Sequence, residues 1–143
     1  MIYLACDHGG FNFKEKIKDK LSKTDLEVKD VGATSLDLDD DFVDFAQLAA
    51  LQMTNEDRGI FLCRNGVGVD IVANRYPQLR SVLGFNPVQV EKSRHDDNCN
   101  VLCLPADYID AQTALSLVDI FLNTPYSAEP RFVRRLEKLD KVK

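Results

Sequence analysis

The sequence lacks any run of apolar residues long enough to cross a bilayer, and its opening stretch MIYLACDHGG holds only a few apolar residues before Asp7. We therefore expect no membrane as a partner and no export segment. The four cysteines form no CxxC pair and do not have the spacing of small secreted domains. The sequence thus predicts neither a zinc site nor a disulfide framework, and a cytoplasmic protein is the expectation.

Positive charge is also scarce, since 18 Lys and Arg residues face 23 Asp and Glu residues, for a net charge of −5. This balance argues against nucleic acid as the main partner. The one charge run, Asp37 to Asp41, lacks the glycine of a calcium-binding loop, so we expect a solvated loop and no metal. The chain has no internal repeats, and 143 residues with 45% hydrophobic content predict a single domain spanning residues 1–143.

Short apolar runs alternate along the chain with segments of helical periodicity. Strands are expected at residues 2–6, 27–31, 60–63, 81–85 and 101–104. Helices are expected at about 12–23 and 43–53, and from about Gly66, Pro87, Asp110 and Pro130 onward. The alternation predicts an α/β fold whose parallel sheet is covered by helices on both faces and binds ligands at the carboxyl ends of its strands.

The stretch GIFLCRNGVGVDIVAN, residues 59–74, has the pattern of a buried strand, a glycine turn and a helix. Cys63 would end the strand, beside Arg64 and the unpaired N–H groups at the helix start, which favour an anion. A thiolate stabilised there would serve as a base or nucleophile near neutral pH. The alternative is an inert buried cysteine, and this segment alone favours that alternative.

Other polar residues fall near the ends of expected elements. Asp7 and His8 follow the first strand, where Asp7 could cap a helix, and His8, one of two histidines, favours a role in ligand binding. The run SRHDDNCN, residues 93–100, is by itself most simply a helix end and a turn. Arg131 and Arg135 lie one helical turn apart on an expected C-terminal helix at about 129–140, where they could clamp a phosphate or be solvated.

Together, the segments ACDHGGFNFKEKI, DFVDFA, CRNGVGVDIVAN, SRHDDNCNVLCL and RFVRR resemble, in order and over nearly the whole chain, the type B ribose-5-phosphate isomerases. That family also includes the galactose-6-phosphate isomerase subunits. The resemblance implies a flavodoxin-like (Rossmann-like) three-layer α/β/α sandwich with a five-stranded parallel sheet. It also implies a homodimer or a dimer of dimers with active sites at the subunit interface. The implied activity is aldose–ketose isomerisation of a sugar phosphate without cofactor or metal, with ribose 5-phosphate and ribulose 5-phosphate as the favoured pair.

The resemblance also implies roles for individual residues. Cys63 matches the base that moves a proton between C1 and C2 through a cis-enediol(ate), whose oxygen atoms the N–H groups of the turn from Asn65 to Val69 would stabilise. Asp7 is placed for a sugar hydroxyl and His8 for the phosphate. The other matched substrate-binding positions are Gly66, Val67, Gly68, Asn74, Asp97, Arg131 and Arg135.

The sequence departs from the family pattern where the sugar ring would be opened. Asn65 replaces a common Thr or Ser and is taken as catalytic, with Arg64 before it. Asp96 stands at the usual histidine position and is the expected acid–base group, which requires a raised pKa; His95, one residue earlier, is the alternative. Asp107 stands where a phosphate-binding arginine is expected, and Arg64 could restore that charge.

These departures leave the function open among three classes. The favoured one is the pentose phosphate isomerase, with a six-carbon sugar phosphate as the variant substrate. The second is a non-catalytic sugar-phosphate-binding module, which the presence of Cys63 disfavours. The third is a nucleotide or flavin binder of flavodoxin type, in which Asp7, His8 and the C-terminal arginines would have no role.

Overall fold

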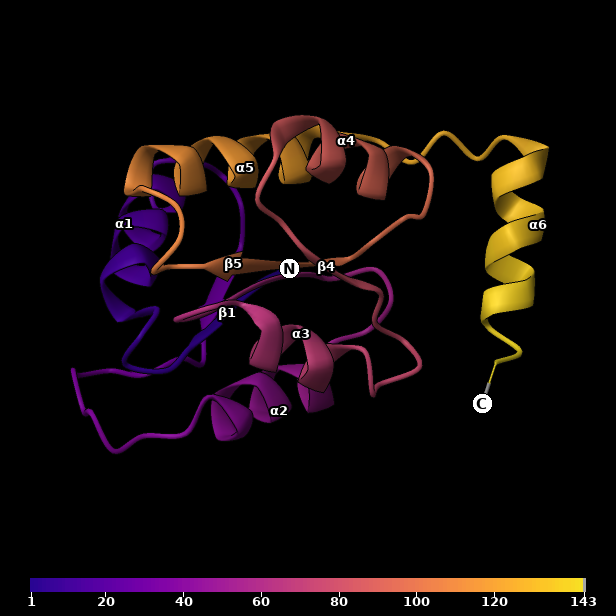
Figure 1. Ribbon diagram of the computed structural model, residues 1–143. Helices are drawn as coiled ribbons and strands as arrows, with labels where there is room; N and C mark the ends of the chain where they lie inside the picture. The colour runs from indigo at the N-terminus through magenta and orange to yellow at the C-terminus, as the bar shows by residue number, and fades with distance from the viewer. Residues whose placement is uncertain (143) are drawn as a thin grey trace.

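In a computed structural model that describes residues 1–142, five parallel strands form one sheet (Figure 1). The strands are β1 (Ile2–Cys6), β2 (Val28–Asp30), β3 (Arg58–Cys63), β4 (Ser81–Leu83) and β5 (Val101–Pro105). Their order across the sheet is β2-β1-β3-β5-β4, and every neighbouring pair is parallel. The predicted five-stranded parallel sheet is confirmed.

The order of the last two strands differs from that of flavodoxin itself, which runs 2-1-3-4-5. Here β5 lies between β3 and β4. After β3 the chain therefore forms β4 at the edge of the sheet and then returns to form β5 between β3 and β4. Burial of the two strands accounts for this order. Every residue of β5 is buried, as suits a strand with neighbours on both sides, whereas the residues of β4 are half-buried, as suits an edge.

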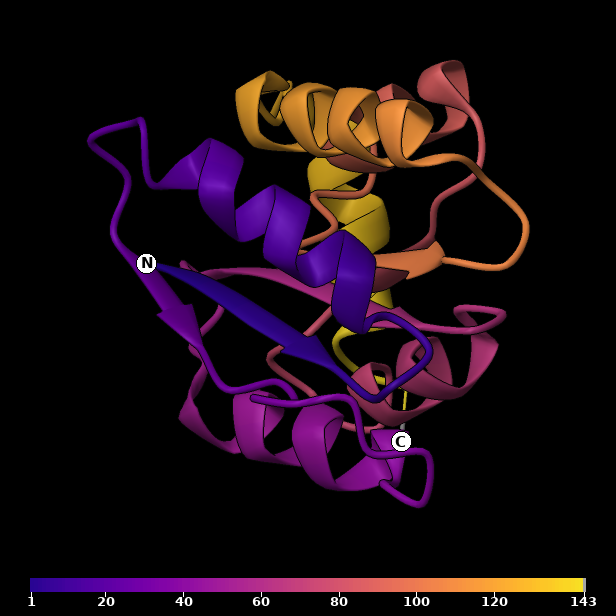
Figure 2. The same ribbon diagram turned by 90° about the vertical axis from the view of Figure 1, so that its left-hand side faces the viewer.

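Helices cover both faces of the sheet and give the predicted three layers (Figures 1 and 2). On one face lie α1 (Phe11–Leu21), α4 (Pro87–His95) and α5 (Ala111–Asn123), and on the other lie α2 (Phe42–Gln52) and α3 (Val67–Ala73). Successive strand residues point to opposite faces, so Leu62 packs on the first side while Phe61 and Cys63 pack on the second. The side chain of Cys63 is thereby directed to the α2–α3 side.

The last helix, α6 (Pro130–Leu139), stands apart beside the sheet in Figure 1. Its buried side chain is Phe132, whose ring centroid lies 6.1 Å from that of His95. Next to its end, Asp140 lies 3.8 Å from Arg80. Because Arg80 precedes β4 and His95 precedes β5, α6 lies at the end of the sheet opposite to the carboxyl ends of the strands.

A buried ion pair fixes the loop that follows β2. Lys14, which is 1% exposed, donates to Asp30 at 2.8 Å and to the carbonyl oxygen of Ala33 at 2.7 Å. Burial alone would raise the pKa of Asp30, but hydrogen bonds from Lys14, Lys18 and the N–H of Gly32 lower it below its ordinary value. The start of the loop 31–41 is thus held by charge as well as by packing.

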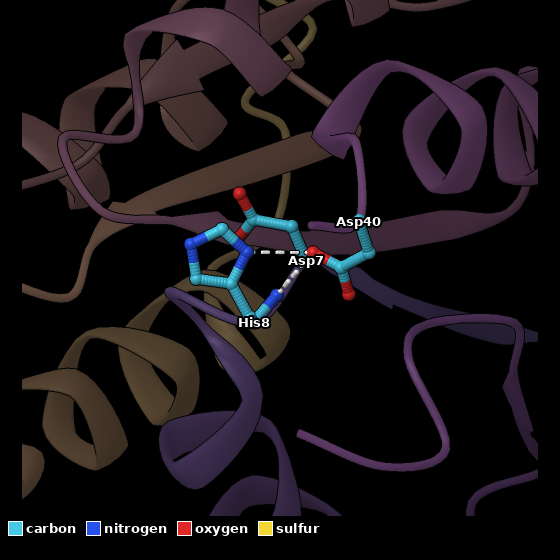
Figure 3. Close-up of side chains that lie close together, drawn as sticks. All are labelled: Asp7, His8 and Asp40. Atoms are coloured by element: carbon cyan, nitrogen blue, oxygen red, sulfur yellow. Dashed lines mark hydrogen bonds and ion pairs between the residues drawn. The ribbon is translucent and has the colours of Figure 1, made fainter. Parts of the chain in front are cut away.

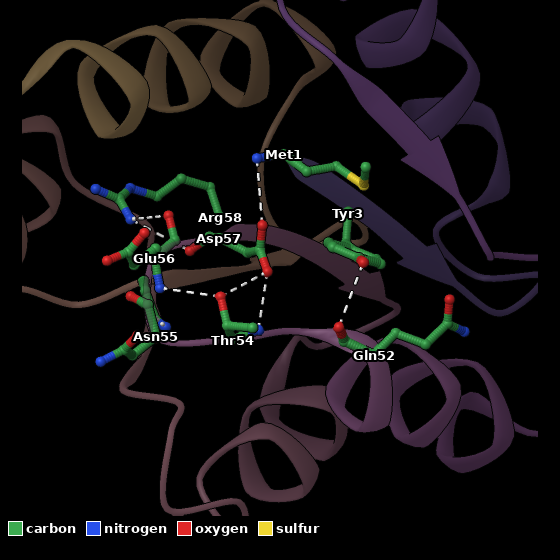
Figure 4. A network of polar contacts seen from close by, with 9 residues as sticks. Met1, Tyr3, Gln52, Thr54, Asn55, Glu56, Asp57 and Arg58 are labelled. Atoms are coloured by element: carbon green, nitrogen blue, oxygen red, sulfur yellow. Dashed lines mark hydrogen bonds and ion pairs between the residues drawn. The ribbon is translucent and has the colours of Figure 1, made fainter.

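A second polar network closes the amino-terminal ends of β1 and β3 (Figure 4). Asp57 accepts from the N–H of Thr54 at 2.8 Å and from its hydroxyl at 2.9 Å, and lies 3.2 Å from the amine of Met1. The hydroxyl of Tyr3 donates to the carbonyl oxygen of Gln52 at 3.4 Å. These contacts hold the strand starts together, away from the carboxyl ends.

The expected elements agree closely with the observed ones. The helices expected from Pro87 and Pro130 begin at those residues, and β1 has the expected bounds. The strands β2 and β4 are shorter than expected because they are the two edge strands and each pairs on one side. Among the described residues, no helix combines the length and apolar character needed to cross a membrane.

Candidate active site

The carboxyl ends of β1 and β3 border a pocket of about 410 Å³. Asp7 and His8 line it from the turn after β1, and Cys63, Arg64 and Asn65 line it from the end of β3 and the turn that follows. The parallel sheet thus brings these predicted site residues together as expected. The lining is completed by Phe42, Val67, Gly68 and Ile71.

Cys63 is the last residue of β3 and is 4% exposed. The backbone N–H of Gly66 donates to its sulfur at 3.2 Å, and Oδ1 of Asn65 lies 3.8 Å from the same sulfur. An N–H donor stabilises the thiolate form of a cysteine, which is the form that acts as a base. The predicted combination of a thiol and a glycine turn is therefore present at the pocket.

The other three cysteines are placed differently. Burial raises the pKa of Cys6 to about 12 and that of Cys99 to about 11, and it raises the pKa of Cys103 well above its ordinary value. Burial in apolar surroundings thus keeps these three thiols protonated. Cys63 is the cysteine that lines the pocket with Asp7 and His8.

The turn after Cys63 requires glycine. Gly66 has φ of +73°, and a Cβ there would lie 2.5 Å from Leu83 Cδ1. The N–H of Val67 donates to Oδ1 of Asn65 at 3.0 Å, and the N–H of Gly66 is used by the sulfur. Two of the N–H groups expected to face a reaction intermediate are therefore already bound within the chain.

Asp7 is buried at the opposite wall of the pocket, with 5% exposure. Its Oδ1 accepts from the N–H groups of Gly9 at 2.9 Å and Gly10 at 3.3 Å, so it orders the turn before α1. Burial raises the pKa of Asp7, and the bond from Gly10 opposes this rise. The side chain is held rigidly at the place where a sugar hydroxyl was expected.

His8 is held by a carboxylate that the sequence did not single out (Figure 3). Asp40 Oδ1 lies 2.7 Å from Nδ1 of His8 and accepts from the backbone N–H of His8 at 2.9 Å. The hydrogen bond to Asp40 raises the pKa of His8 above its ordinary value. The prediction that the whole run Asp37 to Asp41 is a solvated loop is wrong at Asp40, whose side chain is 11% exposed.

Asp7, His8 and Asp40 offer ligand atoms that all lie within 4.8 Å of one another. Hydrogen bonds within the chain already use Nδ1 of His8 and Oδ1 of Asp7 and of Asp40. The two bonds between His8 and Asp40 bring those side chains together, and Asp7 directly precedes His8 in the chain.

Arg64 extends over the rim of the pocket beside the turn after β1. The Cβ that a side chain at Gly9 would add lies 2.4 Å from Cγ of Arg64, so the two turns touch. Nε of Arg64 lies 3.9 Å from Oδ2 of Asp107, and both side chains are exposed. A pair of this length in water is weak, so the guanidinium is free to move to a substrate anion.

His95, Asp96 and Asp97 lie at the end of α4, before β5. Nδ1 of His95 lies 2.6 Å from Oδ1 of Asp96, and this hydrogen bond lowers the pKa of Asp96. The raised pKa that we required of Asp96 is therefore wrong for the chain as described. Burial, followed by the nearby charge of Asp96, instead raises the pKa of Asp97.

Arg131 and Arg135 extend from one face of α6, as their spacing predicts. Their guanidinium carbons lie 4.5 Å and 5.7 Å from the ring centroid of Phe132. Nε of Arg131 also lies 3.0 Å from Glu129 Oε2. Both arginines are exposed and next to the end of α4, because the ring of His95 packs edge-on against that of Phe132.

Asn74 has a structural explanation. Its Oδ1 accepts from the N–H of Ser81 at 2.9 Å and its Nδ2 donates to the carbonyl oxygen of Ser81 at 3.4 Å. These bonds fasten the end of α3 to the start of β4, and Asn74 does not line the pocket at Cys63. The structure does not bring this predicted substrate-binding residue to the others.

Most of the predicted site residues, together with Asp40, fall into two groups. The β1–β3 group consists of Asp7, His8, Asp40, Cys63 and Asn65, and the α4–α6 group consists of His95, Asp96, Asp97, Arg131 and Arg135. The first lies at the carboxyl ends of β1 and β3, and the second lies at the amino-terminal end of the sheet, on the end of α4 and on α6. Because the five residues of β5 span roughly 17 Å, one chain holds the groups at opposite ends of its sheet.

Asp40, Phe42 and Ile71 are pocket or support residues that sequence reasoning did not assign. Nothing in the run LDLDDD distinguishes Asp40 from its acidic neighbours. The segment DFVDFA offered a signal for Phe42, whose ring lies 2.6 Å from the place where a Cβ on Gly68 would be. This contact explains why Gly68 is needed beside the pocket.

The fold and the site define a parallel α/β protein with a thiol, a carboxyl group and an imidazole around a small-molecule pocket at the strand ends. Comparison with known proteins gives the family: the chain belongs to the Ribose/Galactose Isomerase family, whose model matches residues 2–139.

The relatives are similar over nearly the whole chain. A probable ribose-5-phosphate isomerase B of Mycoplasma genitalium is 33% identical over 96% of this chain and 92% of that protein. The crystal structure of a ribose 5-phosphate isomerase from Thermotoga maritima is 39% identical, covers 99% of this chain and 97% of that one, and has a TM-score of 0.91. The ribose-5-phosphate isomerase B of Mycoplasma genitalium with bound ribulose-5-phosphate is 32% identical, covers 98% and 93%, and has a TM-score of 0.93.

Proposed function

We propose that the protein is a cofactor-free aldose–ketose isomerase that interconverts ribose 5-phosphate and ribulose 5-phosphate. The observation that carries the proposal is the position of Cys63, whose sulfur accepts an N–H of the glycine turn and lines one pocket with Asp7 and His8. The family supports the same reaction, because its named relatives are ribose-5-phosphate isomerases. The pocket volume of about 410 Å³ suits a small phosphorylated sugar.

Cys63 acts as the base in this proposal. Its thiolate removes the proton from C2 of the aldose, the electron pair forms the C1–C2 double bond of a cis-enediol(ate), and the same sulfur returns the proton to C1. A proton moves between the oxygen atoms on C1 and C2 in the same exchange. The amide of Asn65 and the free N–H groups of the turn stabilise the charge on these oxygen atoms.

The rest of the sugar is bound by groups on both sides. Asp7 accepts a hydrogen bond from a sugar hydroxyl, and His8 binds the phosphate. Arg131 and Arg135 supply two further guanidinium groups to the phosphate, which is a dianion and needs several charged donors. In this assignment the substrate-binding site is lined by the backbone of Gly66, Val67 and Gly68 and by the polar side chain of Asp97.

We infer that two copies of the chain complete each site. Within one chain the α4–α6 group lies at the far end of the sheet from Cys63, so the arginines of α6 reach a pocket on a second copy. An apolar hollow of about 570 Å³ between α2 and α3 adjoins the pocket and shares Phe42 and Gly68 with it. A homodimer, or a dimer of dimers, that covers this hollow joins the two groups.

Ring opening is assigned to the His95–Asp96 pair. The hydrogen bond of 2.6 Å holds the imidazole in one orientation, with its Nε2 free to exchange a proton with the sugar. Asp96, at the position first assigned to the acid–base group, then acts through His95. This division fits the lowered pKa of Asp96, because a carboxylate that stays charged orients an imidazole better than it donates a proton.

A six-carbon sugar phosphate is the second candidate substrate. The loose pair of Arg64 and Asp107 favours it, because these residues change the charge at the rim where a phosphate would lie. We place either activity in the cytoplasm, where the four free cysteines would stay reduced.

An assay of the untagged protein with ribose 5-phosphate, six-carbon sugar 6-phosphates and unphosphorylated ribose tests the proposal. The expected result is turnover of ribose 5-phosphate, with deuterium from D2O incorporated at C1 of the ketose, and little turnover of free ribose. Preference for a six-carbon phosphate would move the assignment to the second candidate. Absence of isomerisation with every phosphorylated sugar, or equal turnover of free ribose, would overturn it.

A further inference from the structure

The acidic loop before α2 contributes one side chain to the pocket wall. We propose that Asp40 is a positioning residue that holds the proton on Nδ1 of His8 and fixes the orientation of the ring, so that Nε2–H of the cationic imidazole is offered to the phosphate of the substrate. The inference deepens the proposed function and rests on it for the identity of the bound group. It assigns a task to a residue that the sequence placed in a solvated run.

The contacts between the two residues are specific. One oxygen of Asp40 receives both the backbone N–H of His8, at 2.9 Å, and Nδ1 of the ring, at 2.7 Å. A carboxylate accepts hydrogen bonds, so Nδ1 carries the proton. Figure 3 shows the other ring nitrogen on the side of the ring away from Asp40, and His8 lines the pocket.

Asp40 is held in place from both ends of its loop. At the start, Lys14 donates to the carbonyl oxygen of Ala33 at 2.7 Å. At the end, Phe42 opens α2 and packs against Gly68 at the pocket. A carboxylate placed by such contacts is pre-organised, so little ordering is needed when substrate binds.

The cost of this placement also points to a role. Oδ2 of Asp40 is buried and has no hydrogen-bond partner among the described residues. An unpaired buried carboxylate oxygen is unfavourable, and a solvated loop would avoid it by turning outward. Retention of the side chain at His8 is therefore explained by what it does to the imidazole.

Of the three charged side chains that affect His8, two favour its cationic form and one opposes it. Asp40 and Asp7 both favour the cationic ring, whereas Arg64 across the pocket disfavours it. With Asp40 in place, the pKa of His8 lies above its ordinary value, so a larger fraction of the ring is cationic at neutral pH. A cationic ring with Nδ1 engaged binds a phosphate oxygen through Nε2–H.

The test uses 15N-histidine NMR of the untagged protein, in which only His8 and His95 give signals. A spectrum of His95→Gln assigns them. In the parent protein the neutral form of His8 should carry its proton on Nδ1. Finding the proton on Nε2 of the parent protein would overturn the proposal without any variant at Asp40.

Asp40→Asn removes the charge, and Asp39→Asn is the matched control because Asp39 is exposed in the same loop. In Asp40→Asn the midpoint of the His8 titration should fall by about one pH unit. The KM for ribose 5-phosphate should rise about tenfold with kcat little changed. In Asp39→Asn both quantities should stay at the parent values.

Asp40→Glu keeps the charge and should restore part of the titration midpoint of His8. If Asp40→Asn titrates His8 as Asp39→Asn does, the proposal is overturned. The NMR titration needs no turnover, so it fails or succeeds independently of the substrate assignment. If the titration is shifted as expected but the protein has no isomerase activity, the role of Asp40 at His8 stands and the proposed function is contradicted.

Discussion

The β1–β3 group and the α4–α6 group are built in different ways. In the first, Asp7 and Cys63 are buried, His8 and Asp40 are half-buried and Asn65 is exposed, and hydrogen bonds within the chain hold the side chains: Asp7 by turn N–H groups, His8 by Asp40 and Cys63 by Gly66. The second lies on the end of α4 and on α6, whose buried side chain is Phe132 and whose arginines are exposed. In the proposed dimer, one chain pre-organises the proposed base, and the proposed phosphate-binding arm completes the site of a second copy.

The largest effect is expected at the base. Cys63→Ala should lower kcat about 10³-fold, because general-base catalysis is lost while the pocket remains. Cys103→Ala is the control, since Cys103 lies on the same face of the sheet and does not line the pocket at Cys63. Circular dichroism and a thermal melt check the folds. Full activity of Cys63→Ala with an intact fold would remove the thiol from the mechanism.

The support of the β1–β3 group depends on a buried charge. Asp30→Asn should lower the free energy of unfolding by about 3 kcal/mol at pH 7, because the buried Lys14 loses the charge of Asp30 and keeps only the more exposed Glu15 as an anionic partner. The lowered pKa of Asp30 means that its stabilisation is fully present above the ordinary carboxyl pKa of about 3.9 and is lost as the pH falls through the lowered value. Urea denaturation should therefore show a difference between parent and variant that shrinks at low pH. A constant difference, or one equal to that of the exposed control Asp25→Asn, would contradict this account.

The His95–Asp96 pair should act as one unit. His95→Gln and Asp96→Asn should each slow turnover of the cyclic sugar phosphate about 10²-fold, and the double variant should be little worse than either single one. Steady-state kinetics on the three variants measures the coupling. If Asp96→Asn is crippling and His95→Gln is mild, the proton is carried by Asp96 itself. Additive effects would show that the two residues act separately.

The arm on α6 should affect binding more than stability. Arg135→Ala should raise the KM for the sugar phosphate about tenfold with an unchanged melting temperature, because the side chain is exposed and its proposed role is to bind the phosphate. Arg134→Ala, an exposed neighbour in the same helix, is the matched control. If the two substitutions have equal effects on the KM, Arg135 contributes only to the overall positive charge of α6 and does not bind the phosphate specifically.

The placement of Asp7, His8 and Cys63 around one pocket could be predicted from the sequence because the information is local. A buried strand followed by glycines places Cys63, and the parallel sheet places Asp7 and His8 beside it. The role of Asp40 could not be predicted from the sequence, because its contact with His8 spans 32 residues and its loop has the composition of a solvated segment. The pKa of Asp96 was also beyond reach, because it depends on the rotamers of two adjacent side chains. The order of β4 and β5 required knowledge of which strand is buried on both sides.

The most direct test of the central claim, that the two groups meet across a dimer, is activity after mixing two variants, each impaired in a different group. Cys63→Ala and Arg135→Ala are unfolded together, refolded together in equal amounts and assayed at low substrate concentration. Half of the dimers are then mixed, and each mixed dimer has one intact site of two, so about a quarter of the parent activity should return. Activity no higher than that of the separate variants would contradict the claim and place the whole site within a single chain.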